Sequence, residues 1–347
     1  MPLVTDYQAV KDVYQEVREA GAALPVFCAE DRETIEAILA ATVKTGAAVG
    51  RDDLPVIIAW TGRYPGRSQV KLVAACGDPI LGMELMLSDL AVFMGGTSPY
   101  RNVRVLPHLD HAFPWFDGDL LDGYADRMAS VMCDASEKPF EENIRLTARY
   151  VEKMKGRVVI EGAVDEVFES GGTEKNEVTS PEQAVRFLRE TGVDIIVPNV
   201  GTEHRAISAD AHYHSKEARL ISAAVGKILC LHGTSSARKE DISLLPGDGF
   251  VKINIYTTLA IAGGQAVAGS VLENLGNIFD ETRLRELHRR GVLGEKVFEP
   301  GYGGTMPPIK PKLVSVTNPS RRDAWFAAVR NRCCDFFDAL NYRAFAR

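Results

Sequence analysis

The sequence of 347 residues has no run of about 18 or more apolar residues, the length that a membrane-spanning helix needs. Its first residues include Asp and Glu and lack the apolar stretch of a secretion signal. It also lacks an excess of positive charge, because its formal net charge is −7, and this disfavours binding to a phosphate backbone. We therefore expect a cytoplasmic protein that binds neither nucleic acid nor a membrane.

Cysteine is scarce, and no two cysteines have the C-x-x-C spacing of a metal or redox pair. Four of the six lie inside apolar runs, which is typical of buried, reduced thiols in a cytoplasmic protein. The six are Cys28, Cys76, Cys133, Cys230, Cys333 and Cys334.

The sequence does contain eight short apolar runs that alternate with longer helical patterns. Near-continuous apolar strands are typical of parallel sheets that are buried on both faces. Eight such units predict an α/β fold, a (β/α)8 TIM barrel. An open, doubly wound sheet is the main alternative, but no G-x-G-x-x-G follows the first strand. The predicted strands are 24–29, 54–61, 103–110, 129–134, 157–164, 193–200, 227–233 and 249–255.

We expect one domain over 1–347, with a barrel core at about 24–275 and a C-terminal helical extension at about 276–347. A helix within 180–192 is indicated by Ser-Pro at its start and glycine at its end. The Pro- and Gly-rich segment 297–323 is interpreted as an ordered excursion. It precedes a last helix at 323–346, whose apolar face is expected to pack on the barrel or on a partner subunit.

Histidines mark the predicted carboxyl ends of three strands, the end at which barrels of this kind carry their functional groups. Asp110 and His111 close the third strand, His204 follows the sixth and His232 closes the seventh. Three imidazoles from different strands would make a zinc site with an open coordination position. His108, earlier on the third strand, is expected to play a supporting role.

The loops after the last two strands indicate an anion site. Gly-Thr-Ser-Ser at 233–236 and "NIYTT" at 254–258 lie where barrels bind phosphate groups through backbone N–H groups. The histidines predicted at the same strand ends strengthen the prediction of an anion site.

Taken together, these segments resemble the class II, zinc-dependent fructose-bisphosphate and tagatose-bisphosphate aldolases. The resemblance covers about residues 24 to 270, in matching order and spacing. It is carried by "HLDHA", "VMCDASEKPFEENIRLT", "EVFESGGTE", "TGVDIIVPNVGTEH", "ILCLHGTSS" and "GFVKINIYTTLA".

The resemblance implies a lyase that cleaves a ketose into dihydroxyacetone (phosphate) and an aldehyde by a retro-aldol reaction, and a Zn²⁺ cofactor. It implies that Asp110 acts on the C4 hydroxyl, that Glu174 moves the proton at C3 and that Asn254 contacts the enediolate. No Schiff-base lysine is needed; Lys252 could be proposed for one, but its strand position fits the metal-dependent pattern of the family. The implied metal residues are His111, His204, His232, Glu166 and Asp134, and the implied substrate-binding residues are Thr61, Arg205, Gly233, Ser235, Tyr256 and Thr257.

Four departures from the family pattern concern the substrate. Arg205 replaces a glycine of a loop that helps to hold a monovalent cation, so its guanidinium either replaces that cation or binds the anionic group directly. Tyr256 replaces an aspartate, "HGTSS" replaces "HGGSG", and Cys28 falls near the place of an asparagine. These changes favour a related ketose over fructose 1,6-bisphosphate, such as a sulfonated or deoxy sugar that releases unphosphorylated dihydroxyacetone.

Candidates for a second anion contact are Arg63, Arg67, Arg321 and Arg322. The alternative functions are a zinc hydrolase, which the absence of histidine from strand one disfavours, and a catalytically silent barrel. The family also implies a small-molecule sugar substrate and a homodimer or homotetramer.

Overall fold

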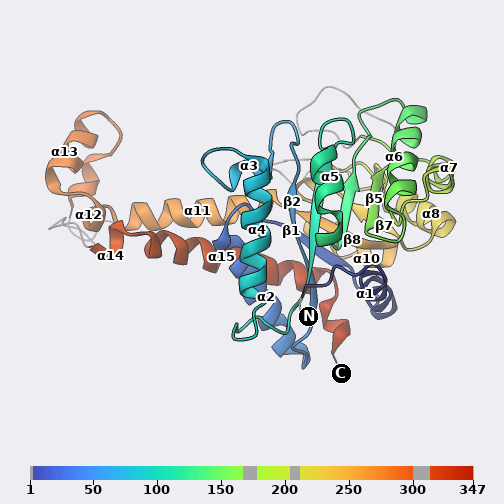
Figure 1. Cartoon of the computed structure of the whole chain (residues 1–347). Coiled ribbons are helices and arrows are strands. Elements are labelled where there is room, and N and C mark those ends of the chain that lie inside the picture. The colour runs from blue at the N-terminus through green and yellow to red at the C-terminus, as the bar shows by residue number, and fades with distance from the viewer. Residues whose placement is uncertain (1–2, 167–177, 204–211, 300–312, 347) are drawn as a thin grey trace. The chain divides into compact units, whose positions relative to one another are not determined.

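The computed structural model describes residues 3–166, 178–203, 212–299 and 313–346, and within them eight parallel strands form a closed barrel (Figure 1). Each strand pairs with the next in sequence, and β1 pairs with β8 to close the ring. This confirms the predicted TIM barrel and makes the open doubly wound sheet wrong. The strands are β1 (Leu24–Cys28), β2 (Pro55–Thr61), β3 (Arg104–Ala112), β4 (Ser130–Cys133), β5 (Val159–Ala163), β6 (Ile195–Val197), β7 (Leu229–Leu231) and β8 (Phe250–Ile255).

Burial explains why these segments are strands. All their residues are buried except Arg104 at the start of β3, which is half-buried. A strand that is covered by helices outside and by barrel side chains inside needs apolar residues on both faces. Among the polar residues that break this pattern are Glu161 of β5 and Lys252 of β8, which are 1% and 0% exposed.

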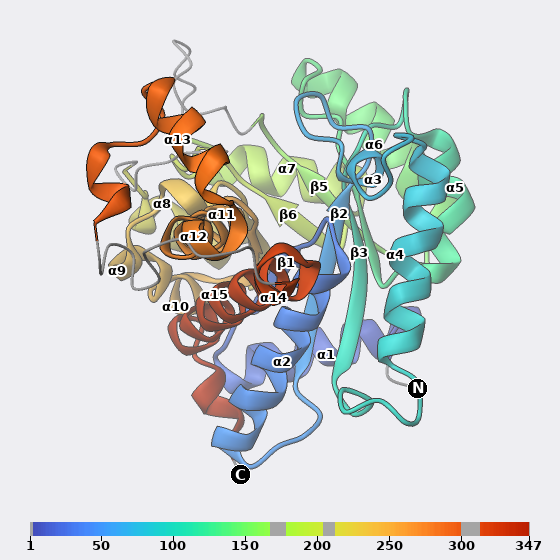
Figure 2. The same cartoon turned by 90° about the vertical axis from the view of Figure 1, so that its left-hand side faces the viewer.

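Helices follow the strands and cover the barrel, and α2 and α4 lie side by side on its outside (Figure 2). The helix predicted within 180–192 is confirmed. Ser180 and Gln183 form a capping box at its start, and Gly192 ends α7 in the left-handed conformation. The helices up to β8 are α1 (Tyr7–Ala20), α2 (Arg32–Val49), α3 (Gln69–Leu72), α4 (Pro79–Phe93), α5 (Gly118–Tyr124), η1 (Ala125–Arg127), α6 (Phe140–Met154), α7 (Pro181–Thr191), α8 (Ser215–Val225), η2 (Thr234–Ser236), α9 (Lys239–Ile242) and α10 (Leu245–Asp248).

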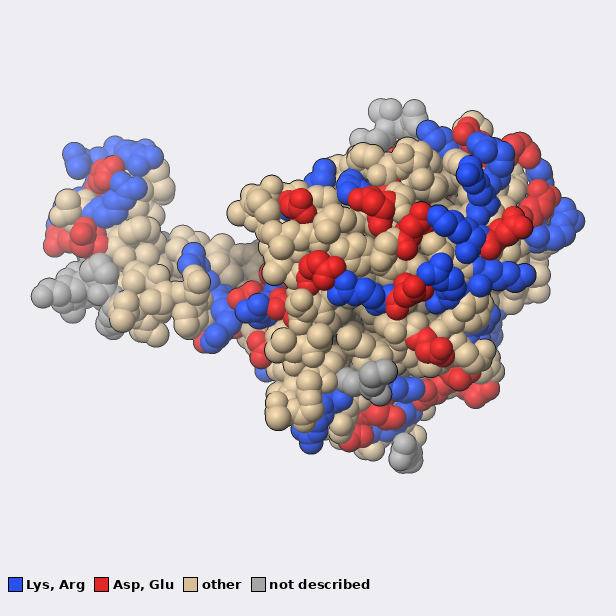
Figure 3. Space-filling model, viewed as in Figure 1, with Lys and Arg blue, Asp and Glu red and all other residues tan. Residues whose placement is uncertain are grey.

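Charges of both signs are interspersed on the face shown in Figure 3. Ion pairs join neighbouring helices, for example Lys153 of α6 with Asp122 of α5 at 2.5 Å. No helix of the described ranges is both long enough and apolar enough to cross a membrane.

The chain divides into two compact units, Met1–Thr257 with Cys333–Arg347 and Thr258–Arg332. The first holds the barrel and also the end of the chain, where Phe336 and Phe337 contact Phe27 of β1 edge to face. Tyr342 donates a hydrogen bond to the Pro55 carbonyl at 2.6 Å. The predicted packing of the last helix on the barrel is therefore observed for its final residues.

The second unit is helical and has a small apolar core around Leu275, Leu284 and Val297. Gly263 lies against the ring of Trp325, because a Cβ at this glycine would lie 2.5 Å from that ring. The prediction of a single domain over the whole chain stays a prediction. The remaining helices are α11 (Thr257–Glu273), α12 (Leu275–Ile278), α13 (Glu281–Arg289), η3 (Glu295–Phe298), α14 (Leu313–Val316), α15 (Asn318–Ala339) and η5 (Tyr342–Phe345).

Candidate active site

An irregularity at the end of β3 brings two consecutive side chains to the barrel mouth. Neighbouring strand residues normally point to opposite faces. The register between β3 and β4 shifts between Leu109 and Ala112, and His111 has a φ of +41°. This left-handed residue reorients the backbone, so that Asp110 and His111 both reach the same centre.

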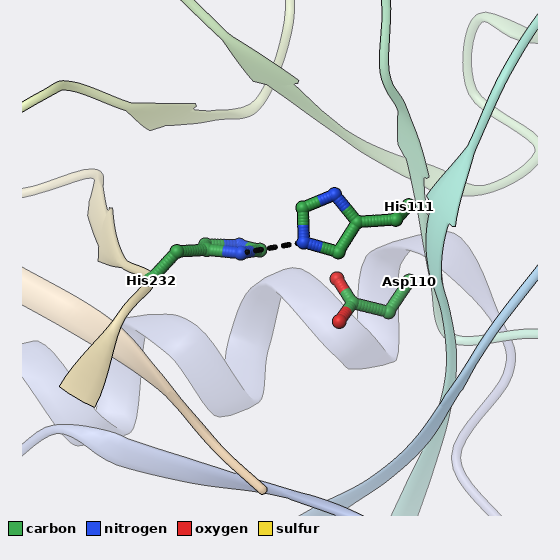
Figure 4. A group of neighbouring side chains, drawn as sticks. All are labelled: Asp110, His111 and His232. Carbon is green, nitrogen blue, oxygen red and sulfur yellow. Dashed lines mark hydrogen bonds between the residues drawn. The ribbon is translucent and has the colours of Figure 1, made fainter. Parts of the chain in front are cut away.

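Asp110, His111 and His232 converge there from β3 and from the end of β7 (Figure 4). The Nε2 atom of His111 lies 3.1 Å from Nδ1 of His232, and the ring planes are 83° apart. All three side chains are buried, and their ligand-type atoms lie within 4.8 Å of one another. Two imidazoles and a carboxylate are a donor set that zinc accepts, so these residues fit a metal ion.

Inside the barrel, a buried ion pair supports this centre. Lys252 Nζ lies 2.6 Å from Glu161 Oε2 and 3.0 Å from His108 Nε2. The other Glu161 oxygen lies 2.9 Å from His232 Nε2. Burial works to raise the pKa of Glu161, but the charge of Lys252 and the contact with His232 outweigh it and lower that pKa. The ionised carboxylate therefore orients His232, as carboxylates often do for metal-binding histidines.

Asp110 is held as a carboxylate. Asn254 donates a hydrogen bond to its Oδ1 at 3.0 Å, and Cys28 Sγ lies 4.0 Å from its Oδ2. Burial works to raise the pKa of Asp110, but His111 and the other two histidines outweigh it and hold that pKa well below its usual value. Asp110 is therefore ionised, which is the state in which a carboxylate can act as a base.

His111 is fixed by contacts on several sides. Its Nδ1 lies 2.7 Å from Asp134 Oδ2, and the ring of Tyr64 stacks on the imidazole with centroids 4.5 Å apart. Ser136 donates two hydrogen bonds to the other Asp134 oxygen. Burial works to lower the pKa of His111, but Asp110 and Asp134 outweigh it and raise it to about 9. A metal cation would take the place of the proton that this environment favours.

The implied substrate-binding residues that the structure describes lie at or just after the carboxyl ends of β2, β7 and β8. Gly233 has a φ of +72° and approaches the backbone of Glu203 so closely that a Cβ would lie 2.7 Å from its carbonyl oxygen. Ser235 lies in η2, and Thr257 begins α11. The hydroxyl of Thr61 donates a hydrogen bond to the Arg67 carbonyl and accepts one from the Gln69 amide. The ring of Tyr256 lies under the guanidinium of Arg67.

Three of the implied residues, Glu174, His204 and Arg205, lie outside the described residues. The residues just before His204 are anchored at the mouth. Thr202 donates a hydrogen bond to the His232 carbonyl, and the Glu203 amide donates one to Ser236. Glu166 is exposed on the segment after β5, and it is absent from the three described groups of metal-ligand type.

The sequence does not single out Glu161 or Tyr64, which contact the histidines of this centre, and Lys252 is considered there only as a Schiff-base lysine, a role that its strand position disfavours. The pairing of buried charges at Glu161 and Lys252 could have been suspected from the sequence. Each is a charged residue inside an apolar strand, and such residues are rarely buried unless they are paired. For Tyr64 the sequence carries no such signal, because its contact with His111 depends on the course of the loop after β2.

A closed parallel barrel that collects histidines and carboxylates at the carboxyl ends of its strands defines a (β/α)8 enzyme with a candidate metal centre. Comparison with known proteins then identifies the family. Residues 8–292 match the model of the family "Fructose-bisphosphate aldolase class-II". The chain therefore belongs to the class II fructose-bisphosphate aldolase family, and it is a lyase of the aldolase type.

Individual relatives agree with this assignment. The chain is 28% identical over 306 residues to a fructose-bisphosphate aldolase of Staphylococcus epidermidis, covering 85% of this chain and 96% of that protein. It is 27% identical over 306 residues, with the same coverage, to one of Staphylococcus aureus.

Solved structures share the fold. The fructose-bisphosphate aldolase of Campylobacter jejuni superposes with a TM-score of 0.71 at 20% identity, covering 98% of this chain and 95% of that one. The YdjI aldolase of Escherichia coli gives 0.65 at 20% identity, covering 99% and 100%.

Proposed function

We propose that this aldolase is zinc-dependent and cleaves an anionic ketose, phosphorylated or otherwise charged, by a retro-aldol reaction to dihydroxyacetone (phosphate) and an aldehyde. The observation that carries the proposal is the buried convergence of Asp110, His111 and His232. A general base beside two metal-type nitrogens is what this cleavage requires.

The metal ligands in this proposal are His111, His232 and His204, with Asp134 and Glu166 as further carboxylates near the ion. The anchoring of Thr202 and Glu203 against the end of β7 supports a ligand at position 204. When bound, zinc supplies Lewis-acid stabilisation of the negative charge that develops on the ketone half. A monovalent cation is in doubt because Arg205 stands where the family has glycine.

The protein groups carry the proton transfers. Asp110 takes the proton of the C4 hydroxyl, the electron pair of the broken O–H bond forms the C=O bond of the aldehyde, and the pair of the broken C3–C4 bond stays on the ketone half. In this proposal Asn254, whose amide donates a hydrogen bond to Asp110, also donates one to that half. Glu174 then supplies the proton to C3. The remaining contacts to the substrate come from Thr61, Arg205, Gly233, Ser235, Tyr256 and Thr257.

The test is a coupled assay for dihydroxyacetone phosphate and free dihydroxyacetone on ketoses that carry phosphate at C1, at C6, at both or at neither. Cleavage only of C1-phosphorylated ketoses would mean that the loops after β7 and β8 bind phosphate. Release of free dihydroxyacetone would favour the modified-sugar alternative, such as a sulfonated or deoxy ketose.

Asp110→Asn is expected to lower kcat by roughly 10²- to 10⁴-fold, the usual contribution of a general base. Asp126→Asn serves as the control, since this carboxylate is 71% exposed and pairs with Arg157. If Asp110→Asn kept full activity, the proposed role of Asp110 would be wrong.

A further inference from the structure

We infer that Glu30, Arg67 and Tyr256 form a charge-neutral wall of the active site, which selects ketoses whose aldehyde-forming half is uncharged. The inference rests on the proposed aldolase function and concerns the substrate class of the same site. The three residues come from the carboxyl ends of β1, β2 and β8, and "neutral wall" denotes them below.

The neutral wall adjoins the place where the bond breaks. With Asp110 acting at C4, we place the carbons beyond C4 against the ends of β1 and β2, where the ring of Tyr256, which follows the neighbouring strand β8, faces Arg67. Thr61 of β2 is the direct neighbour of Asp110 in the sheet, and Cys28 of β1 lies 4.0 Å from its carboxylate. Glu30 follows Cys28 by two residues, so the aldehyde-forming half meets the ends of β1 and β2.

The charges of the neutral wall cancel. Arg67 donates two parallel hydrogen bonds to Glu30, Nε to Oε1 at 2.7 Å and Nη2 to Oε2 at 2.5 Å. Gln69 also donates to Glu30, at 3.3 Å. The Arg67 guanidinium lies 5.0 Å from the centre of the Tyr256 ring. Burial and the nearby Glu30 raise the pKa of Tyr256, so its hydroxyl stays protonated and neutral.

Other polar groups of the loop after β2 are engaged within the protein. Thr61 donates to the Arg67 carbonyl, and Ser68 donates to the Gly62 carbonyl. Arg63 pairs with Asp119 at 2.6 Å and with Asp117 at 3.2 Å. A phosphate or carboxylate placed against these residues would have to break a bidentate ion pair before it gained a donor, whereas hydroxyl groups would not.

The pair therefore discriminates by charge. An anion next to Glu30 meets a carboxylate as well as a guanidinium, and the two effects oppose each other. A neutral polyol pays no such cost and can lie along the aromatic face of Tyr256. Removing the charge of Glu30 while keeping Arg67 should convert the neutral wall into an anion site.

The experiment compares wild type with Glu30→Gln in aldol addition, using whichever ketone wild type accepts, dihydroxyacetone or its phosphate. The acceptors are D-glyceraldehyde and D-glyceraldehyde 3-phosphate, each with separate kcat and KM. Wild type is expected to prefer D-glyceraldehyde. Glu30→Gln should shift the kcat/KM ratio toward the phosphorylated aldehyde by about tenfold or more, mainly through KM.

The matched control is Glu30→Gln/Arg67→Gln, in which the two residues are again neutral in sum and the ratio should return toward wild type. Melting temperatures of all three proteins check that folding is intact. A wild type that prefers the phosphorylated aldehyde, or a ratio that Glu30→Gln leaves unchanged, overturns the inference alone. Failure of the zinc-restored wild type to join either aldehyde to either ketone refutes the proposed function, and this inference with it.

Discussion

At His111 the backbone has a φ of +41°, a conformation that costs a residue with a side chain roughly 1–2 kcal/mol. The cost is offset by contacts of its imidazole with Asp134, His232 and Tyr64. Such supporting contacts orient a metal ligand before the metal arrives. Of these three partners, only Tyr64 is not one of the implied metal residues.

We therefore expect Tyr64→Leu to weaken zinc binding by about tenfold, because the imidazole loses the surface that fixes its plane. Tyr64→Phe keeps the ring and should bind zinc as wild type does. Competition with a chromophoric chelator measures both dissociation constants.

Tyr100→Leu is the control for this prediction, since Tyr100 contacts Phe93 and Glu36 away from the barrel mouth. If Tyr64→Phe lost as much zinc affinity as Tyr64→Leu, the stacked ring would not be what holds His111.

The sequence predicted part of the centre at this scale. Asp110, His111 and His232 could be found because each stands at a predicted strand end. The pairing of Glu161 with Lys252 could not be predicted, because it depends on which strands face each other across a closed barrel. The roles of all the site residues stay predictions, and for Glu174 and His204 the placement lies outside the described residues as well.

Among the elements, the strands were predictable nearly throughout, since double burial leaves an apolar signature that depends on few distant contacts. The observed bounds differ from the predicted ones by at most three residues at each end, as for 193–200 against Ile195–Val197. The last helix was less predictable. It begins at Asn318 and ends at Ala339. The chain then turns at Asn341, which has a φ of +64°.

The segment between β7 and η2 depends on Gly233. Gly233→Ala would force a side chain into the left-handed region and place its Cβ 2.7 Å from the Glu203 carbonyl oxygen. We expect a loss of about 2–4 kcal/mol in the free energy of unfolding, measured by urea denaturation.

Gly156→Ala separates the cost of the left-handed backbone from the cost of the close contact. Gly156 has a similar φ of +76° but open space around it. This substitution should cost only about 1 kcal/mol. Equal losses in the two variants would show that the close approach to Glu203 contributes nothing.

Glu16 links α1 to two other parts of the barrel, because it bonds to Arg51 at 2.7 Å and to Arg104 at 2.8 Å. Burial works to raise the pKa of Glu16, but hydrogen bonds from Arg104 and Arg51 outweigh it and lower the pKa. A lowered carboxyl pKa stabilises the fold at pH values above the pKa of the unfolded chain. This contribution is lost as the pH falls through the folded pKa.

Glu16→Gln should therefore be less stable than wild type by about 0.5–1 kcal/mol at pH 7, a modest value because the pair is partly exposed. The difference should shrink as the pH falls below the usual glutamate pKa of about 4.3 and vanish only below the lowered pKa of Glu16, where the folded protein also binds the proton. Denaturation curves at a series of pH values measure it. If the difference in stability between wild type and Glu16→Gln stayed constant down to pH 3, the charge of Glu16 would not be what stabilises the fold.

At the scale of the whole molecule, large apolar side chains are exposed in the second unit. Val292, Leu313 and Val314 have exposed fractions of 59%, 78% and 66%. Apolar surface of this kind is often covered by another subunit. The homodimer or homotetramer stays a prediction.

Sedimentation is expected to give two or four times the chain mass of 37.9 kDa. Leu313→Glu/Val314→Glu should lower that mass, because a charge in an apolar contact is costly. Val92→Glu is the control, as Val92 is 75% exposed on α4 of the first unit. A wild type that sediments as a monomer at micromolar concentration would contradict the expectation.

The central claim is that a metal held by histidines at the barrel mouth drives ketose cleavage, and one measurement tests it most directly. Carbonyl product formation is followed on the cleaved ketose with native protein, with EDTA-treated protein and with treated protein after zinc is restored. We predict that chelation abolishes product formation and that activity returns in proportion to bound zinc, measured on the same samples. Full activity in protein shown to be free of metal, or inactivation by borohydride through a lysine Schiff base, would contradict the account.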